Sequence, residues 1–285
     1  MRIGGRRESE NVEDRRGSHF RLGGGGKIGI GTIVLALVAM YFGIDPSVVF
    51  DTASVQSPSP ATQPASPRSA AEDELARFAS QVLADTEDTW GPVFASAGGQ
   101  YREPRMVLFT GATRSACGVG QAEMGPFYCP ADEKVYLDLS FFDDLQNRFR
   151  APGDFAQAYV IAHEVGHHVQ NLLGISEKVQ QAREQLPARE ANALSVRVEL
   201  QADCLAGVWG HHADRTRQLL EAGDVEEALG AASAIGDDRL QKQAQGQVVP
   251  DSFTHGSSAQ RARWFRLGLE RGDLRACDTF SPGAL

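Results

Sequence analysis

The sequence is poor in cysteine, and its few cysteines stand far apart. Among 285 residues there are only four cysteines, and no two of them have a Cys-x-x-Cys spacing. A zinc site built from cysteine thiolates is therefore disfavoured, because such sites draw their ligands from closely spaced pairs. No internal repeat with a period of about 20–50 residues is apparent, which argues against a repeat architecture.

Basic residues are also scarce, since 28 Lys and Arg stand against 37 Asp and Glu, for a formal net charge of −9. Seven of the basic residues lie within residues 1–27, so the rest of the chain is more acidic than this average. Nucleic acid is therefore a poor candidate partner. With 42% hydrophobic residues, the chain is long enough for one substantial globular domain plus accessory segments.

The segment His163-Glu164-Val165-Gly166-His167 has the spacing of a catalytic zinc motif. Residues four apart on a helix share one face, with Cβ atoms about 5–6 Å apart, so both imidazoles can reach one ion. Glu164 can then hold a water and take its proton, the general-base role in metalloproteases. Apolar spacing over 155–173 predicts one buried helix, with Asp154 as N-cap and Gly174 as stop. The competing interpretation is a pair of hydrogen-bonded core histidines.

A third zinc ligand is expected from a second helix, because catalytic zinc usually has three protein ligands and one open position. Residues 189–213 are rich in Ala, Leu, Glu and Arg and predict that helix. Within it, Glu199 and Asp203 are again four residues apart, so Glu199 can bind zinc while Asp203 accepts the outer N–H of a ligand histidine. The competing interpretation of either acid is a solvated helix carboxylate.

These two patterns resemble those of the gluzincins, the thermolysin-like zinc peptidases with His-Glu-x-x-His on one helix and Glu-x-x-x-Asp on the next. The chain is more closely similar to the bacterial putative neutral zinc metallopeptidases. The stretches that carry this similarity are residues 6–17, 163–170, 199–213, 253–256 and 258–261. The resemblance implies a membrane-anchored zinc peptidase fold, and it supplies no substrate.

Residues 28–44 form an uncharged apolar run of 17 residues, about the lower limit for a membrane-spanning helix. Asp45 and Pro46 end the run and no Ala-x-Ala cleavage site follows, which favours an uncleaved transmembrane anchor over a signal peptide. The basic residues in 1–27 predict a flexible tail that stays in the cytoplasm. Residues 45–71 are rich in Pro, Ser and Ala, which predicts an extended linker.

Residues 72–285 are expected to form an α+β domain outside the membrane, a zincin-like metallopeptidase domain with a small sheet and an active-site helix pair. Helices are predicted over 71–90 and 258–270, the latter capped by Ser257 or Ser258 and stopped by Gly272, and strands over 105–110 and 133–140. The alternating strand 133–140 is also a candidate shelf on which an extended substrate adds as a further strand.

The four cysteines fall in this external domain, where an oxidising compartment favours disulfides. Three pairings of Cys117, Cys129, Cys204 and Cys277 are possible. We favour Cys117 with Cys129, because they flank one loop between strands. The remaining pair, Cys204 with Cys277, would then pin the tail of the chain onto the helix of Glu199.

The function predicted from the sequence is that of a zinc-dependent metalloendopeptidase acting on peptides or proteins. One Zn²⁺ is expected at His163, His167 and Glu199, with Glu164 as general base. His255, in a polar and turn-rich segment, is either a hydrogen-bond donor to the developing oxyanion or a structural loop residue. The other histidines near these segments, His168, His211 and His212, are expected around the site or on the surface.

The expected location is the bacterial cytoplasmic membrane, with a single pass at 28–44, the N-terminus in the cytoplasm and the catalytic domain in the periplasm or outside the cell. Two other functions stay open. One is a catalytically inactive zinc-fold module that binds or scaffolds a partner, against which the intact Glu164 argues. The other is a metal-dependent hydrolase of substrates other than peptides.

Overall fold

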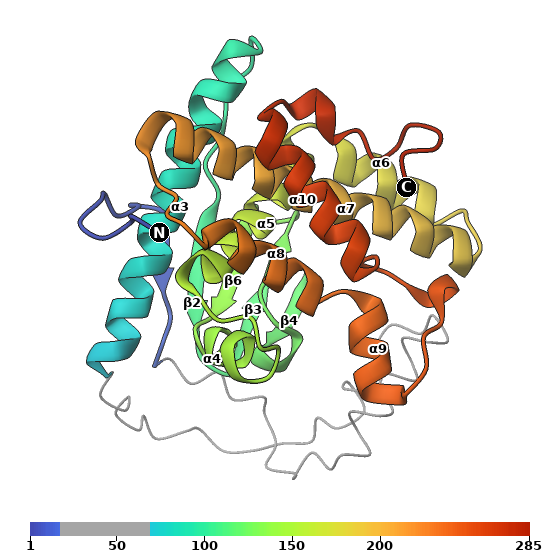
Figure 1. The fold of residues 1–285 in the computed structure, drawn as a ribbon, viewed down its shortest axis with the longest axis horizontal. Coiled ribbons are helices and arrows are strands. Elements are labelled where there is room, and N and C mark those ends of the chain that lie inside the picture. Colours follow the sequence, from blue (N-terminus) through green and yellow to red (C-terminus); the bar gives the residue numbers. More distant parts are fainter. Residues whose placement is uncertain (18–68) are drawn as a thin grey trace. The chain divides into compact units, whose positions relative to one another are not determined.

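A four-stranded sheet and a set of long helices make up residues 1–17 and 69–285, the part of the chain that the computed structural model describes (Figure 1). The α+β class expected from the sequence is confirmed. The apolar run 28–44 and nearly all of the expected linker lie outside the described residues. Within the two described ranges, no helix has the length and apolar character needed to cross a bilayer.

The sheet has the strand order β1-β2-β6-β5. Strands β1 (Val12–Asp14), β2 (Arg105–Phe109) and β6 (Lys134–Asp138) run parallel, and β5 (Phe127–Cys129) runs antiparallel to β6 at the edge. Strands β2 and β6 lie within the two predicted strand segments.

The proposed substrate shelf at 133–140 is wrong, because β6 lies inside the sheet with β2 on one side and β5 on the other. The alternation of its residues suggested one covered face. Both faces are in fact covered, since Tyr136 is only 1% exposed and stacks on Phe127 with ring centroids 4.7 Å apart. The edge strands are β1 and β5, neither of which the sequence revealed.

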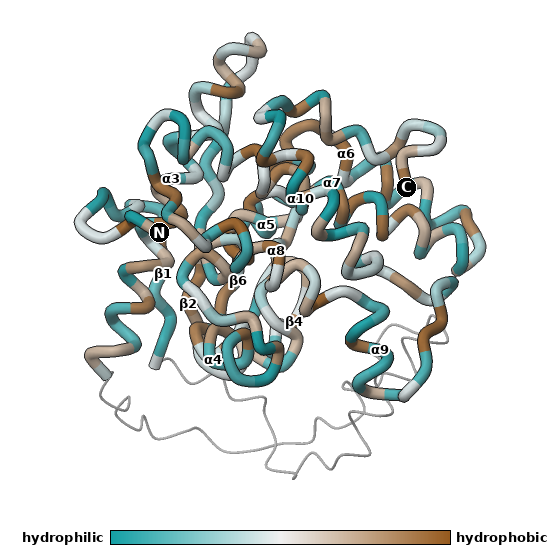
Figure 2. Tube along the Cα trace, in the orientation of Figure 1, coloured by the Kyte–Doolittle hydropathy of each residue, from teal (hydrophilic) through white to brown (hydrophobic). Residues whose placement is uncertain are grey.

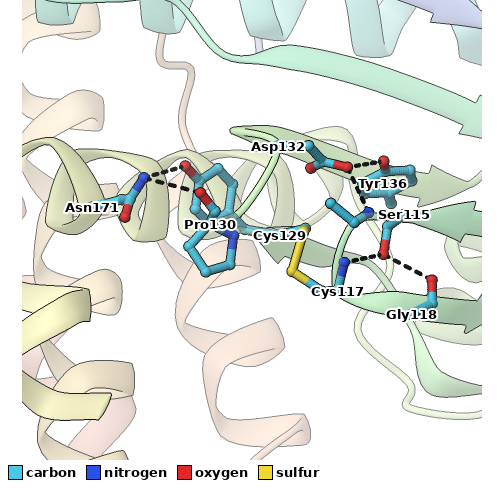
Figure 3. The surroundings of a disulfide bond; sticks show 10 residues. Ser115, Cys117, Gly118, Cys129, Pro130, Asp132, Tyr136 and Asn171 are labelled. Carbon is cyan, nitrogen blue, oxygen red and sulfur yellow. Dashed lines mark hydrogen bonds between the residues drawn. A yellow bond between two sulfur atoms is a disulfide. The ribbon is translucent and has the colours of Figure 1, made fainter. Parts of the chain in front are cut away.

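A two-stranded hairpin, β3 (Ala112–Ser115) with β4 (Gly118–Gln121), and the short 3₁₀ helix η1 (Ala122–Met124) precede β5. A disulfide joins Cys117, in the turn of the hairpin, to Cys129 at the end of β5 (Figure 3). The same turn is held by the Ser115 hydroxyl, which accepts from the Cys117 N–H and donates to the Gly118 carbonyl oxygen. The favoured pairing of these two cysteines is therefore confirmed.

Residues 1–17 pack into the same unit as residues 69–285, which corrects the expectation of a flexible tail. Strand β1 pairs with β2, and Arg16, only 8% exposed, donates to the Glu72 carbonyl oxygen and forms an ion pair with Asp73. The charged residues that suggested a solvated segment thus have partners within the fold. Because a strand cannot pair across a bilayer, this pairing is incompatible with residues 1–17 and 69–285 on opposite sides of a membrane.

The predicted helices begin within about a residue of the predicted positions, but α3 (Ala70–Ser96) and α7 (Ala188–Arg217) run on beyond the predicted ends at 90 and 213. Helix α3 begins with a capping box of Ser69 and Glu72, and α10 (Ser258–Arg271) with one of Ser257 and Gln260. The remaining elements are α4 (Ser140–Asn147), α5 (Asp154–Leu172), α6 (Ile175–Arg183), α8 (Asp224–Ala234), α9 (Asp237–Gln245), η2 (Pro250–Ser252) and η3 (Leu274–Cys277). Asp154 is not an N-cap, because α5 takes it as its first residue after Gly153.

The core lies around α5, which α7, α10 and the sheet cover. Phe155 of α5 stacks on Trp209 of α7, with ring centroids 5.7 Å apart. Helices α7 and α10 come very close, since a Cβ atom on Gly268 would lie 1.9 Å from the Cys204 carbonyl oxygen. The second disulfide, Cys204 with Cys277, fastens η3 to α7 and confirms the other favoured pairing. Helix α9 is drawn as mostly hydrophilic in Figure 2, in keeping with its single buried residue, Asp237.

Candidate metal centre

Helices α5 and α7 bring the three residues that the sequence singled out as zinc ligands to one point. His163 and His167 lie one turn apart on α5, and Glu199 faces them from α7. One donor atom from each of the three residues lies within 4.8 Å of the others. The Nε2 atoms of His163 and His167 are 3.2 and 3.6 Å from the two carboxylate oxygens of Glu199.

The spacing suits three ligands of one zinc ion. Two ligand atoms that each lie about 2.1 Å from zinc are about 3.4 Å apart in a tetrahedron, and each imidazole lies near that distance from one Glu199 oxygen, Oε2 for His163 and Oε1 for His167. The donor set of two imidazoles and one carboxylate is one that catalytic zinc uses, with a fourth position left for water. The side chains of His167 and Glu199 are 17% and 19% exposed, so water can reach the site.

Asp203 fixes the orientation of the His163 ring through the ring nitrogen that faces away from Glu199. Its carboxylate is fully buried and lies 2.9 Å from His163 Nδ1, so Nδ1–H donates to it and Nε2 faces Glu199. Asp203 also accepts a hydrogen bond from the Tyr159 hydroxyl. Two nitrogens of the buried Arg261 of α10 donate to it as well, both at 2.9 Å. Four hydrogen bonds thus fix the carboxylate that orients the imidazole.

The charges around His163 favour its protonated form in the metal-free protein. Burial alone would lower the pKa of His163, but the Asp203 charge, its hydrogen bond and that of Glu199 outweigh burial and raise the pKa to about 10. For the carboxyl group of Asp203, burial alone would raise the pKa, but the charges of Arg261 and His163 outweigh burial and lower the pKa to about 2. A metal ion at this point therefore takes the place of a proton.

Glu164 lies on α5 beside His163 and is 8% exposed. It makes no hydrogen bond or ion pair with any residue in the described ranges, whereas Glu199 and Asp203 are both engaged. Its carboxylate is therefore available to a water molecule at the site, as a general base must be.

His255 stands beside the three clustered side chains on the turn between η2 and α10. The Asp237 carboxylate of α9 accepts the backbone N–H groups of Thr254, His255 and Gly256, at 2.7, 2.6 and 3.0 Å, and lies 3.2 Å from His255 Nδ1. The His255 side chain is 51% exposed. Partial burial lowers the pKa of His255, but the Glu199 charge and the Asp237 hydrogen bond outweigh it and raise the pKa.

The other three histidines within the described ranges bind elsewhere. His168 is fully buried, and its ring bridges the Tyr128 hydroxyl of β5 and the Arg102 carbonyl oxygen. His211 and His212 lie near the carbonyl oxygens of Leu269 and Gly272, at the end of α10. His168 therefore ties the edge strand to α5, and the other two tie α7 to α10.

Sequence reasoning missed Arg261, Tyr159 and Asp237. Tyr159 is four residues before His163 on α5, a spacing that could have suggested contact with the partner of that histidine. Arg261 and Asp237 carry no such signal, because each comes from a helix distant in sequence. Asp237 lies on a hydrophilic helix that the sequence did not distinguish from a solvated segment.

Comparisons with known proteins agree with this geometry. The profile of a family described as "Putative neutral zinc metallopeptidase" matches residues 1–280. The "Uncharacterized protein YpfJ" of Escherichia coli (strain K12) is 55% identical over 289 residues, covering 98% of this chain and 99% of the relative. The "Uncharacterized protein Rv2575" of Mycobacterium tuberculosis (strain ATCC 25618 / H37Rv) is 45% identical over 206 residues, covering 69% of this chain and 67% of the relative. No solved structure matches the chain.

Proposed function

The chain belongs to the putative neutral zinc metallopeptidase family, and from that premise we propose that it is a zinc-dependent metalloendopeptidase that hydrolyses peptide bonds. The observation that carries the proposal is the approach of His163, His167 and Glu199 within reach of one ion, with the unengaged Glu164 beside His163 on the same helix. One zinc ion held by the three side chains would lower the pKa of water and polarise the substrate carbonyl group.

The protein's own groups account for the proton movements. Glu164 takes a proton from the attacking water and passes it to the leaving amine. His255, whose raised pKa favours the protonated ring, can donate a hydrogen bond to the oxygen on which negative charge develops. Asp237 fixes the backbone and ring of His255, and Asp203 keeps the ring of His163 in the orientation that zinc binding requires.

Strand β5 is the better candidate for the substrate shelf. It is the edge of the sheet on the side of α5, and Tyr128 connects it to His168, the residue after His167. An extended peptide that adds to this edge would run beside the helix that carries the two histidines. Backbone hydrogen bonds of this kind bind a peptide without specifying its side chains, which suits an endopeptidase.

We also propose that the catalytic unit and residues 1–17 lie together outside the cytoplasmic membrane, with residues 28–44 attaching them to the membrane without crossing it. The two disulfides support an oxidising compartment. The pairing of β1 with β2 supports a location of residues 1–17 on the same side as the catalytic unit. A single crossing with a cytoplasmic N-terminus, the arrangement that the charges favour, is therefore not retained.

The test is incubation of the purified full-length protein with unfolded proteins and peptide libraries, with and without zinc, followed by mass spectrometry of the products. The full chain is needed because residues 1–17 are part of the folded unit. New peptide termini that require both zinc and Glu164 are expected. Bound zinc without cleavage of any peptide would instead support the scaffold alternative, and cleavage of other substrates alone would support a different hydrolase.

A further inference from the structure

We propose that Gln170 and Gln201 form a relay that sets the tautomer of His167 and couples zinc binding to the C-terminal segment held by the Cys204–Cys277 disulfide. The inference rests on the proposed function in one respect, since it takes His167 as a zinc ligand. It concerns a part of the site in which the two histidines differ, because His163 has a charged partner and His167 has a neutral one.

The orientation of the Gln170 amide follows from its acceptors. Gln170 is fully buried, and its Nε2 donates to the Val198 carbonyl oxygen at 2.7 Å and to Gln201 Oε1 at 3.0 Å. A backbone carbonyl can only accept, so the amide nitrogen must point to Val198 and the amide oxygen must point the other way. That oxygen, Oε1, lies 2.9 Å from His167 Nδ1.

The tautomer of His167 follows from that orientation. Because Gln170 Oε1 can only accept, His167 Nδ1 must carry the proton that it donates. The lone pair of a neutral His167 is then on Nε2, the nitrogen that lies 3.6 Å from Glu199. Gln170 thus does for His167, with an uncharged oxygen, what Asp203 does for His163.

The second glutamine extends this chain to the C-terminal segment. Gln201 is 8% exposed, and its Nε2 donates to the Cys277 carbonyl oxygen at 2.9 Å, which leaves its own oxygen facing Gln170. Cys277 is fixed in place by the disulfide to Cys204 of α7, 73 residues earlier in the chain. The Thr279 hydroxyl, donating to the Arg197 carbonyl oxygen, fastens the same segment one turn before Gln201 on α7.

Opening the disulfide would loosen the segment whose carbonyl oxygen orients Gln201, and with it one of the two acceptors of Gln170. Gln170 would then be held by the Val198 carbonyl oxygen alone, so its amide oxygen would support the Nδ1–H tautomer of His167 less firmly. His163 is unaffected by this sequence of events, because Asp203 is held by Tyr159 and Arg261. The two imidazoles thus provide an internal comparison.

The experiment measures zinc affinity against a competing chelator, together with the ring nitrogen shifts of both histidines by NMR on the metal-free protein at alkaline pH. Gln170→Leu should weaken zinc binding by about 10–100-fold, the scale for residues that orient a ligand, and should mix the tautomers of His167 alone. Gln201→Leu should have the same effect in smaller measure. Gln81→Leu is the matched control, since Gln81 is 6% exposed and bonds only a distant backbone oxygen.

Disulfide coupling is tested by a cycle of variants. Cys277→Ser should weaken zinc binding in the wild type and have no added effect in Gln201→Leu, because residues in one network are not additive. Equal effects in both backgrounds would overturn the coupling to the C-terminal segment. Unchanged zinc affinity and His167 shifts in Gln170→Leu would overturn the relay itself. These readouts use no substrate, so a protein with an intact relay that cleaves no peptide would contradict only the proposed function.

Discussion

Gly166 of α5 lies directly against Ala202 of α7, so closely that a Cβ atom on Gly166 would be 2.9 Å from the Ala202 carbonyl oxygen. The contact falls between His163 and His167 on one helix and beside Glu199 on the other. The absence of a side chain at this one position therefore sets the distance between the helices that carry the three clustered side chains.

The first prediction concerns this contact. Gly166→Val must push α5 and α7 apart, because the obstructing atom belongs to the backbone and cannot rotate away. We expect the free energy of unfolding to fall by about 1–3 kcal/mol, the usual range for overpacking. Zinc affinity should fall as well, because Glu199 moves away from the histidines. Denaturant unfolding and chelator competition measure the two effects.

Gly230→Ala is the matched control, since Gly230 lies in a helix with nothing within 4 Å of an added Cβ atom. That change should leave zinc affinity as it is and stabilise the protein by about 0.5–1 kcal/mol. Zinc binding that is equally strong in Gly166→Val would show that the approach of the helices does not set the site.

A second prediction concerns pH. Because the pKa of His163 is raised to about 10, zinc must displace a proton from this ring at neutral pH. Loss of this one proton should therefore make the apparent zinc affinity rise about tenfold per pH unit until the pH reaches about 10. Titrations against a chelator of known pH dependence give the slope, and a flat profile would contradict the protonated state of His163.

The stability of the metal-free protein should change in the opposite direction. The pKa of His163 is higher in the folded protein than the value of 6.5 in the unfolded chain, so its contribution is complete below about 6.5 and is lost as the pH rises towards about 10. Asp203 behaves conversely, because its pKa is lowered to about 2, and its contribution is lost as the pH falls through that value.

The sequence was most informative where contacts are local. The i, i+4 spacing of His163 and His167, and that of Glu199 and Asp203, places each pair on one helix face without knowledge of the tertiary fold. Which helices would meet was inferred from zinc chemistry, and the structure brings them together. Arg261, which binds Asp203, and Asp237, which binds His255, come from other helices, and no short-range sequence pattern predicts such contacts.

The limits of the fold prediction have the same origin. The cap at Ser257 gave the start of α10 to within about a residue, because a cap acts on its own helix. The neighbours of a strand in a sheet are set by distant segments, so β6 was found while its interior place was not. Strand β1 was missed for the same reason, since the strand that it pairs with, β2, begins only at Arg105.

A third prediction tests His255. His255→Ala should lower kcat and kcat/KM together by about 10²–10³, because one donor to an oxyanion is lost. The melting temperature and zinc content should stay the same, since Asp237 still holds the backbone of the turn. Asp237→Ala is the comparison and should destabilise the turn as well. An early-melting or fully active His255→Ala would show that the residue is structural.

A fourth prediction concerns the two sides of the membrane. The described residues contain no free cysteine, so Glu8→Cys and Gln185→Cys would each introduce one reactive thiol at an exposed position. Because residues 1–17 pack with the catalytic unit, a reagent that cannot cross membranes should label both positions in the same preparation of cells. Labelling of one position in intact cells and of the other only after lysis would contradict the pairing of β1 with β2.

The central claim is that Glu164 moves the proton at a zinc site formed by three other residues. The most direct measurement is zinc content and peptide hydrolysis in Glu164→Gln, side by side with the wild type. Because the three clustered side chains are untouched, this variant should bind one zinc per chain and fail to cleave peptides that the wild type cleaves. Hydrolysis at the wild-type rate by the zinc-loaded variant would contradict the account.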